Sequence, residues 1–185
     1  MGRGGCDAIM NTEWCVISGP PCSGKTTLIN ELEALGYPVV HEVARSLITS
    51  CLRPGMTPKE IQARKSTLQH DILRVKLEIE NGLSANQTTF FDRGIPDSIA
   101  YFKLAGLDPG QVIDSARIRR YKHVFFLEAL PYRKDSVRIE ETASAATLAE
   151  SLEKSYRIVG YEPIRIPCVS TEERLRCILE YLSRR

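Results

Sequence analysis

One stretch near the N-terminus combines glycines, a lysine and hydroxyl residues at a spacing that suits phosphate binding. It matches the pattern G-x-x-x-x-G-K-[ST] at every fixed position. Together with the threonine that follows, it consists of Gly19, Pro20, Pro21, Cys22, Ser23, Gly24, Lys25, Thr26 and Thr27. Glycines allow backbone N–H groups to turn toward phosphate oxygens, and a helix that begins here adds the positive end of its dipole. We therefore expect residues 19–27, the phosphate loop, to bind a nucleotide.

Three side chains of the phosphate loop have chemistry of their own. We expect Lys25 to bridge the terminal phosphates and to act in catalysis, and the Thr26 hydroxyl to ligate Mg²⁺. The alternative is a tight strand-to-helix turn in which these residues are incidental. Cys22 stands beside the same N–H groups and Lys25, which favour a thiolate. We hypothesise that it is the most reactive thiol without nucleotide and that ATP shields it; the alternative is a sulfur turned into the protein.

Acidic residues follow three other stretches that are expected to be strands. Asp92 comes directly after the apolar run 88–91, the pattern of a carboxylate that holds Mg²⁺ directly or through water. The alternative is an aspartate that starts a turn before Gly94. Glu128 follows a further strand, and we expect it to be an ordinary loop acid. Because ligands bind outside the carboxyl ends of parallel strands, Asp92 is expected at the site.

Glu42 is the third of these acids, and Arg45 follows it three residues later. Glu42 could act as the general base for an incoming hydroxyl group, and Arg45 could hold an anionic group. The alternative is a solvated i, i+3 ion pair between the two side chains. Arg93, directly after Asp92, is expected to contact phosphates in catalysis or, alternatively, to be a surface arginine.

A basic segment lies between the fourth strand and the helix after it. Residues 131–147 are polar and lack a helical period, so we expect a lid-like surface loop. Arg133 and Arg138 within it would bind the nucleotide, because mobile basic loops exclude water and neutralise transferring charge. The alternative is a simply solvated loop. No N-K-x-D sequence follows the fourth strand, so adenine is a better expectation than guanine. The implied ligands are ATP as co-substrate and Mg²⁺.

Strands and helices alternate along the whole chain. The expected strands are continuous apolar runs, which is typical of a parallel sheet covered by helices on both faces. The fold class that this pattern predicts is a three-layer α/β domain with a mainly parallel five-stranded sheet. We expect strands at 13–18, 37–41, 88–91, 123–127 and 163–167, and helices at 26–35, 43–52, 57–80, 97–105, 111–119, 147–159 and 170–184.

Composition limits the class of protein. The chain has 185 residues, of which 43% are hydrophobic and 26% charged, with a net charge of +2. These values fit one globular domain and give no strong signal for nucleic acid. We expect residues 13–185 to form that domain and residues 1–12 to be a flexible N-terminus. No apolar run is long enough to cross a membrane, and no C-x-x-C pair occurs among the six cysteines. A reduced, cytoplasmic setting is expected.

Taken together, these segments resemble those of the NadR/Ttd14-like P-loop ATPase family of AAA-type ATP-binding domains. The resemblance covers residues 13–183 and rests on Gly19–Thr27, Glu42-Val43-Ala44-Arg45, Phe91-Asp92-Arg93-Gly94-Ile95-Pro96-Asp97, then Tyr132, Asp135, Arg138, Tyr156 and Gly160-Tyr161-Glu162. It implies a kinase-like P-loop NTPase fold with strand order 2-3-1-4-5. The group includes nicotinamide riboside kinase domains, and one branch resembles a regulator that binds GTP and phospholipid.

Two hypotheses of function follow. The first is an ATP-dependent kinase that phosphorylates a small hydroxyl-bearing metabolite, with the nucleotide and that metabolite as its partners. The second is a nucleotide-dependent switch, using ATP or GTP, that binds a protein or phospholipid partner. The two differ in ATP consumption: a kinase needs an acceptor for fast turnover, whereas a switch shows only slow intrinsic hydrolysis.

Overall fold

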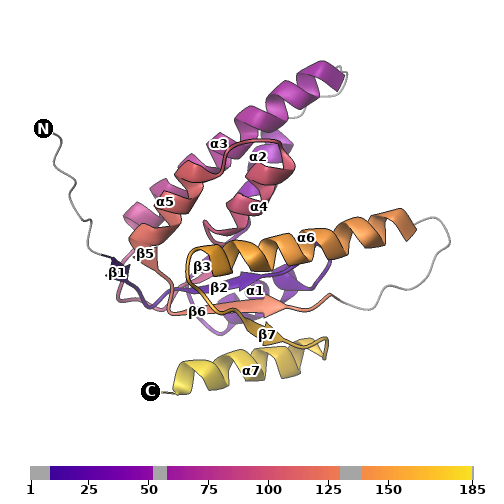
Figure 1. The fold of residues 1–185 in the computed structure, drawn as a ribbon. Coiled ribbons are helices and arrows are strands. Elements are labelled where there is room, and N and C mark those ends of the chain that lie inside the picture. The colour runs from indigo at the N-terminus through magenta and orange to yellow at the C-terminus, as the bar shows by residue number, and fades with distance from the viewer. Residues whose placement is uncertain (1–8, 52–57, 130–138, 185) are drawn as a thin grey trace, which may run out of the picture.

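The computed structural model describes residues 9–51, 58–129 and 139–184, and Figure 1 shows their arrangement. The strands are β1 (Met10–Asn11), β2 (Cys15–Ser18), β3 (Val39–Val40), β4 (Phe90–Asp92), β5 (Arg119–Arg120), β6 (His123–Leu127) and β7 (Ile164–Ile166). The helices are α1 (Lys25–Ala34), α2 (Val43–Cys51), α3 (Pro58–Gly82), α4 (Asp97–Leu104), α5 (Gly110–Ile118), α6 (Ile139–Ile158) and α7 (Thr171–Ser183).

The main sheet has five strands in the order β3-β4-β2-β6-β7, and every neighbouring pair is parallel. This confirms both the expected fold class and the expected order, in which the second, third, first, fourth and fifth strands lie side by side. The central strand β2 has Val16 opposite Phe91 of β4 and Val124 of β6. All four residues of β2 are buried, as continuous apolar runs in a doubly covered sheet require.

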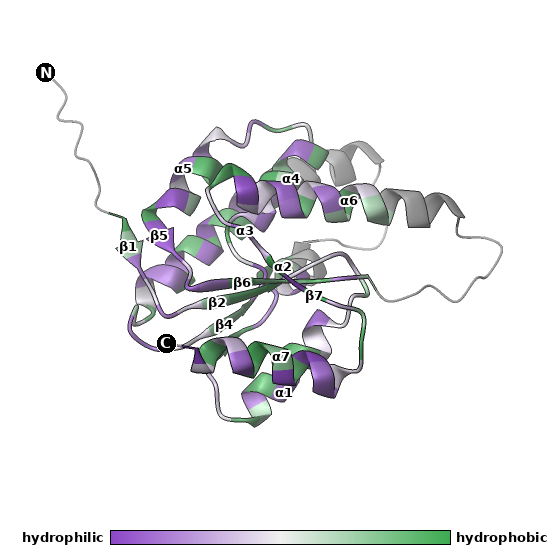
Figure 2. Ribbon diagram, turned by 60° about the horizontal axis from the view of Figure 1, so that its bottom comes forward, coloured by the Kyte–Doolittle hydropathy of each residue, from purple (hydrophilic) through white to green (hydrophobic). Residues whose placement is uncertain are grey.

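Helices cover both faces of this sheet, as an edge-on view shows (Figure 2). On one face, α1 and α7 bury Leu28, Leu32 and Ile178 against strand residues such as Ile17 and Phe125. On the other face, α3, α4, α5 and α6 form a second core with the opposite sides of the same strands. The three layers hold the carboxyl ends of the strands at one edge, where the phosphate loop and Asp92 lie.

A second, two-stranded sheet was not expected. Met10 and Asn11 of β1 pair in parallel with Arg119 and Arg120 of β5, and the backbone N–H of Thr12 donates to the Arg120 carbonyl at 2.9 Å. The expectation that residues 1–12 form a flexible terminus is therefore wrong for its last residues. Two-residue strands carry too little alternation to be visible in the sequence.

The expected loop at 131–147 is also corrected in part, because α6 begins at residue 139. Residues 139–146 contain alanine and glutamate, which favour a helix, but too few large apolar side chains to show a period. Residues 130–138, with Arg133 and Arg138, lie outside the described residues. The other helices end within a few residues of their expected bounds. No helix in the described part is both long and apolar enough to span a membrane.

Candidate functional site

The phosphate loop turns sharply between β2 and α1 and needs unusual backbone angles to do so. Gly19 has a φ of 143°, and a Cβ placed on it would lie 2.7 Å from the Leu127 carbonyl oxygen of β6. Gly24 has a φ of 88°, and Cys22 adopts a φ of 58° despite its side chain. Glycine at position 19 is therefore required by the neighbouring strand, and the loop closes tightly over the end of the sheet.

Backbone N–H groups in this turn are left free by the rest of the fold. Within residues 9–51, 58–129 and 139–184, no hydrogen bond uses the N–H of Cys22, Ser23 or Gly24 as a donor. Successive unpaired N–H groups before the first turn of a helix form an anion-binding concavity. The geometry of this loop therefore agrees with phosphate binding.

Lys25 lies inside the loop rather than on the surface. Its ammonium donates to the Gly19 carbonyl at 3.1 Å, to the Pro20 carbonyl at 2.7 Å and to the Ser23 hydroxyl at 3.3 Å. Burial, with a contribution from the nearby Arg93 charge, lowers the Lys25 pKa to about 8. A cation held by carbonyl dipoles can exchange them for phosphate oxygens, which are stronger partners because they are charged.

Thr26 and Asp92 are brought together, as a shared metal site requires. The Thr26 hydroxyl lies 3.5 Å from Asp92 Oδ2, whereas the buried Asp92 Oδ1 has no hydrogen-bond partner among the described residues. Burial raises the Asp92 pKa, and the negative charge of Glu42 raises it further. A hydroxyl, a carboxylate and an unsatisfied carboxylate oxygen are the oxygen donors that Mg²⁺ takes, so the residues present fit this ion.

The Arg93 side chain is buried and held by protein groups. The residue has a φ of 70°. The guanidinium donates to Glu42 Oε1 at 3.1 Å, to the Gly19 carbonyl at 3.2 Å and to Asp97 Oδ1 at 3.3 Å. Arg93 therefore links the phosphate loop to Glu42. The alternative of a surface arginine is wrong, and the expected contact with phosphates stays a prediction.

Glu42 directly precedes α2 and lies beside Asp92, and its side chain is 22% exposed. Arg93 holds one of its carboxylate oxygens. The other oxygen, Oε2, lies 3.8 Å from Arg45, whose side chain is 71% exposed. The i, i+3 pair that the sequence left as an alternative is therefore present. Arg93 and Arg45 thus contact different oxygens of the Glu42 carboxylate.

Asp97 is a central residue that sequence reasoning missed. Its completely buried carboxylate accepts hydrogen bonds from the Ser18 hydroxyl at 2.6 Å, from the Gly94 N–H at 2.9 Å, and from Arg93 and the Tyr156 hydroxyl. It thereby fixes the turn between β4 and α4 that carries Arg93. The D-R-G-x-P-D spacing was visible as part of a family resemblance, but only the fold shows what the second aspartate holds.

Two cavities meet at Glu42 and Asp92. The larger measures about 680 Å³ and opens between the phosphate loop, α2 and α3, with Thr26 on its wall. The smaller measures about 110 Å³ and lies behind Asp92, between α2, α3 and α4. Both cavities therefore share the two carboxylates of Glu42 and Asp92.

The smaller cavity has a polar wall, made of Glu42, Gln69, Lys76, Arg93, Ser98 and Tyr101. Lys76 of α3 is only 8% exposed, and its ammonium donates to the Gly94 carbonyl at 2.7 Å and to the Ser98 hydroxyl at 3.3 Å. Burial lowers the Lys76 pKa. In the described part of the chain, neither the Gln69 amide nor the Tyr101 hydroxyl has a hydrogen-bond partner. The polar wall therefore offers hydrogen bonds to a ligand.

The remaining expected residues are distributed as follows. Cys22 is exposed, which does not support a sulfur turned into the protein. Pro20 is buried under the loop, whereas Pro21 and Thr27 are exposed. Glu128 is exposed, as expected of a loop acid. The roles of all these side chains in binding remain predictions.

The same fold occurs in solved structures, among them two kinases and the NadR protein. Deoxyadenosine kinase from M. mycoides, determined with dCMP and dCDP, superimposes with a TM-score of 0.62 at 17% identity, covering 91% of this chain and 98% of that one. Thymidylate kinase from Ehrlichia chaffeensis gives 0.61 at 15%, covering 94% and 100%. NadR protein in complex with NR gives 0.63 at 15%, covering 92% of this chain but 51% of that one.

Likeness at these identities establishes the fold. A search of the curated proteins finds no match to this sequence. A family model does match, and it spans the phosphate loop, both carboxylates and the first turn of α7. Because this model, described as an AAA domain, covers residues 14–174, the chain belongs to the AAA domain family that the model defines.

Proposed function

We propose that this protein is a kinase that transfers the γ-phosphate of Mg²⁺–ATP to a hydroxyl group of a small metabolite. One observation carries the proposal: Lys25 in the phosphate loop, the Thr26–Asp92 pair and Glu42 converge where two cavities meet. A phosphoryl transfer site needs these parts, namely a phosphate cradle, a metal site and a base beside room for an acceptor.

The nucleotide would bind through the phosphate loop. The free N–H groups of residues 22–24 would donate hydrogen bonds to oxygens of the β-phosphate. The Lys25 ammonium would leave the loop carbonyls and contact the terminal phosphates instead. Mg²⁺, held by Thr26 and Asp92, would neutralise charge that develops on the phosphates. Arg93 would keep Gly19 and Glu42 in fixed relation, so that the acceptor and the phosphate are aligned before reaction.

Glu42 would act as the general base. The acceptor oxygen forms a bond to the γ-phosphorus while the bond from that phosphorus to the β,γ-bridging oxygen breaks. The hydroxyl proton passes to Glu42 Oε2, and ADP leaves with the electron pair of the broken bond. Arg93 restrains Oε1 and thereby directs the other carboxylate oxygen toward the cavities.

Three observations support a polar metabolite of about nucleoside size as the acceptor. The cavity of about 680 Å³ lies within the range of small-molecule pockets, and it shares Glu42 and Asp92 with the polar cavity of about 110 Å³. The body of the acceptor would occupy the larger cavity, and one end of it would reach the polar wall. Related folds include a deoxyadenosine kinase and a protein determined with NR. The polar wall, with its buried Lys76, favours an acceptor that brings a hydrogen-bond-accepting group such as a carbonyl.

The test is ADP formation from Mg²⁺–ATP with and without acceptors. A thermal-shift screen of nucleosides, vitamins and sugars beside a non-hydrolysable ATP analogue selects the acceptors. We expect turnover to depend on one of them. Slow hydrolysis that no acceptor accelerates would contradict the proposal and favour a nucleotide-dependent switch.

Three variants test the proposed roles of single residues in binding ATP, Mg²⁺ and the acceptor. Lys25→Ala should weaken ATP binding about ten- to a hundredfold, because a charge-assisted hydrogen bond is lost. Asp92→Asn should remove the Mg²⁺ dependence of ATP binding. Lys76→Met should raise the KM for the acceptor and leave ATP affinity unchanged. If Asp92→Asn keeps the Mg²⁺ response of the unaltered protein, another acid holds the metal.

A further inference from the structure

Arg174 is a buried cation with no assigned role, in the first turn of α7. The helix begins with a capping box between Ser170 and Glu173, and the Arg174 side chain that follows is 3% exposed. Placed there, its charge faces the positive end of the helix dipole and is removed from water. Both effects oppose its burial, so neighbouring groups must compensate for them.

The compensating groups are backbone carbonyls from three different loops. Nη1 donates to the Ser23 carbonyl at 2.6 Å, Nε to the Pro167 carbonyl at 2.9 Å, and Nη2 to the Glu128 carbonyl at 3.2 Å. These carbonyls belong to the phosphate loop and to the segments that follow β7 and β6. A guanidinium can join all three because its donors form a rigid planar fork.

The bond to Ser23 bears directly on the phosphate loop. In a trans peptide the C=O and N–H groups point in opposite directions, and this chain has no cis peptide bond in its described residues. When Arg174 holds the Ser23 carbonyl, the Gly24 N–H of the same peptide must point to the opposite side. The guanidinium also lies against Gly24, where a Cβ would be 3.4 Å from Nη1.

Arg174 also places a positive charge behind the loop. Among the described residues no carboxylate lies within ion-pair distance of its guanidinium, and Glu172 and Glu173 on the same turn are exposed. Carbonyl dipoles offset a full charge only in part, and a buried charge is screened weakly. A polyanion bound at the loop would supply the missing counter-charge.

We propose that Arg174 is a positioning residue for the nucleotide phosphates. It orients the peptide between Ser23 and Gly24 so that the N–H faces the phosphates, and its charge strengthens their binding. Docking of α7 on the sheet thereby becomes part of the phosphate site, although this helix contributes no residue to the sequence motif (Figure 1). The inference rests on the proposed binding of a nucleotide by residues 19–27.

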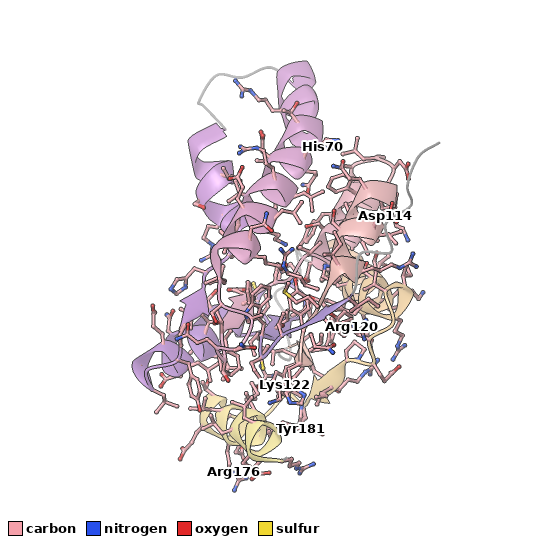
Figure 3. All side chains as sticks on the ribbon, turned by 90° about the vertical axis from the view of Figure 1, so that its left-hand side faces the viewer. His70, Asp114, Arg120, Lys122, Arg176 and Tyr181 are labelled. Carbon is pink, nitrogen blue, oxygen red and sulfur yellow. The ribbon has the colours of Figure 1, made fainter. Side chains whose placement is uncertain are left out.

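The experiment compares Arg174→Met and Arg174→Lys with the control Arg176→Met. Arg176 lies on the exposed, outer side of the same helix, as Figure 3 shows. Mg²⁺–ATP and AMP compete with a fluorescent ATP analogue, and circular dichroism and melting temperature report the fold. Arg174→Met should weaken ATP binding about ten- to a hundredfold and AMP binding less, since AMP has no β-phosphate. Arg174→Lys should lie between, and Arg176→Met should be unchanged.

Several outcomes overturn the inference. One is a folded Arg174→Met protein with unaltered ATP affinity, and another is an equal loss for ATP and AMP, which indicates a purely structural role. If Arg174→Met does not fold, the ATP affinity of Arg174→Lys tests the inference instead. An ATP affinity of Arg174→Lys equal to that of the unaltered protein would contradict it. Failure of the unaltered protein to bind ATP, or normal binding by Lys25→Ala, would instead refute the proposed function.

Discussion

The two sides of the proposed site differ in the groups that form them. On the proposed nucleotide side, a continuous stretch of nine residues presents backbone N–H groups, and the side chains of Lys25 and Thr26 complete it. On the proposed acceptor side, the polar wall consists of side chains from α3, from α4 and from the residues directly before α2 and directly after β4. Backbone chemistry is the same for any sequence that can adopt the turn, whereas the polar wall can change with each substitution.

This difference separates what the two sides can do. The backbone cradle suits phosphates, which every nucleoside triphosphate carries. The polar wall is where one acceptor can be distinguished from another, because buried hydrogen-bonding groups left unpaired by the wrong ligand are costly. Variants on the acceptor side should therefore change transfer and acceptor binding, while ATP binding stays as it was.

The largest expected effect is on Glu42→Gln. A general base contributes on the order of 10²–10⁴-fold, so phosphoryl transfer should slow by that factor. ATP affinity should stay unchanged, because Arg93 keeps its bonds to the Gly19 carbonyl and Asp97. Single-turnover transfer to an acceptor found in the screen, together with ATP titration, measures both quantities.

The matched control for that variant is Glu33→Gln on α1, whose carboxylate is half exposed and pairs with His41. It should leave transfer and ATP affinity unchanged. Loss of ATP affinity in Glu42→Gln would break the separation of the two sides, since Glu42 would then shape the phosphate loop through Arg93. Unaltered transfer would remove Glu42 as the base.

A second effect concerns stability, because a buried carboxylate supports the turn beside Arg93. Glu80 of α3 is 3% exposed; its Oε1 accepts from the Tyr121 hydroxyl at 2.5 Å, and its Oε2 has no partner among the described residues. Tyr121 in turn accepts from the Ile95 N–H at 3.0 Å, in the turn beside Arg93. Burial raises the Glu80 pKa from 4.5 to about 7.

The sign of the pH dependence follows from this shift. Between pH 4.5 and about 7 the folded protein retains a proton that the unfolded chain has lost, so Glu80 makes stability fall as pH rises. The loss is complete above about pH 7 and amounts to roughly 3 kcal/mol. Glu80→Gln should gain that stability relative to the unaltered protein between pH 4.5 and 8, measured by urea unfolding. If the free energy of unfolding depends on pH in the same way in Glu80→Gln and the unaltered protein, the prediction is contradicted. The control is Glu78→Gln, whose side chain is exposed on the same helix.

Sequence and structure agree most closely on the nucleotide side. The phosphate loop is one local stretch with a fixed pattern, and the pairing of Thr26 with Asp92 follows from parallel strands that end at one edge. Arg93 could be placed near the site but not oriented, because its left-handed φ and its bonds to Gly19 and Asp97 depend on the assembled turn.

Residues joined only by tertiary contacts could not be predicted. In the sequence, Lys76 is one of several charged residues on a long helix. Only the fold shows that it is buried and donates to the Gly94 carbonyl beside the site. Arg174 likewise reads as a cation in a helix that begins with Glu172 and Glu173. Its carbonyl partners come from positions up to 151 residues away.

The smallest expected effect uses Cys22 to report on the nucleotide side alone. Cys22 is exposed within the loop, whereas Cys15 is buried and its pKa is raised to about 12 by burial. We expect mild alkylation to label Cys22 faster than the half-buried Cys177 of α7 or Cys15, because the Cys22 side chain is exposed to the reagent. Mg²⁺–ATP should slow labelling of Cys22 severalfold and leave labelling of Cys177 unchanged, as peptide mass mapping would show.

Acceptor alone should not protect Cys22 if the two sides are separate. Protection by acceptor without ATP would mean that the polar wall and the loop move together, through the Arg93 link between Glu42 and Gly19. A labelling rate that ATP does not alter would mean that phosphates do not occupy the turn at Cys22.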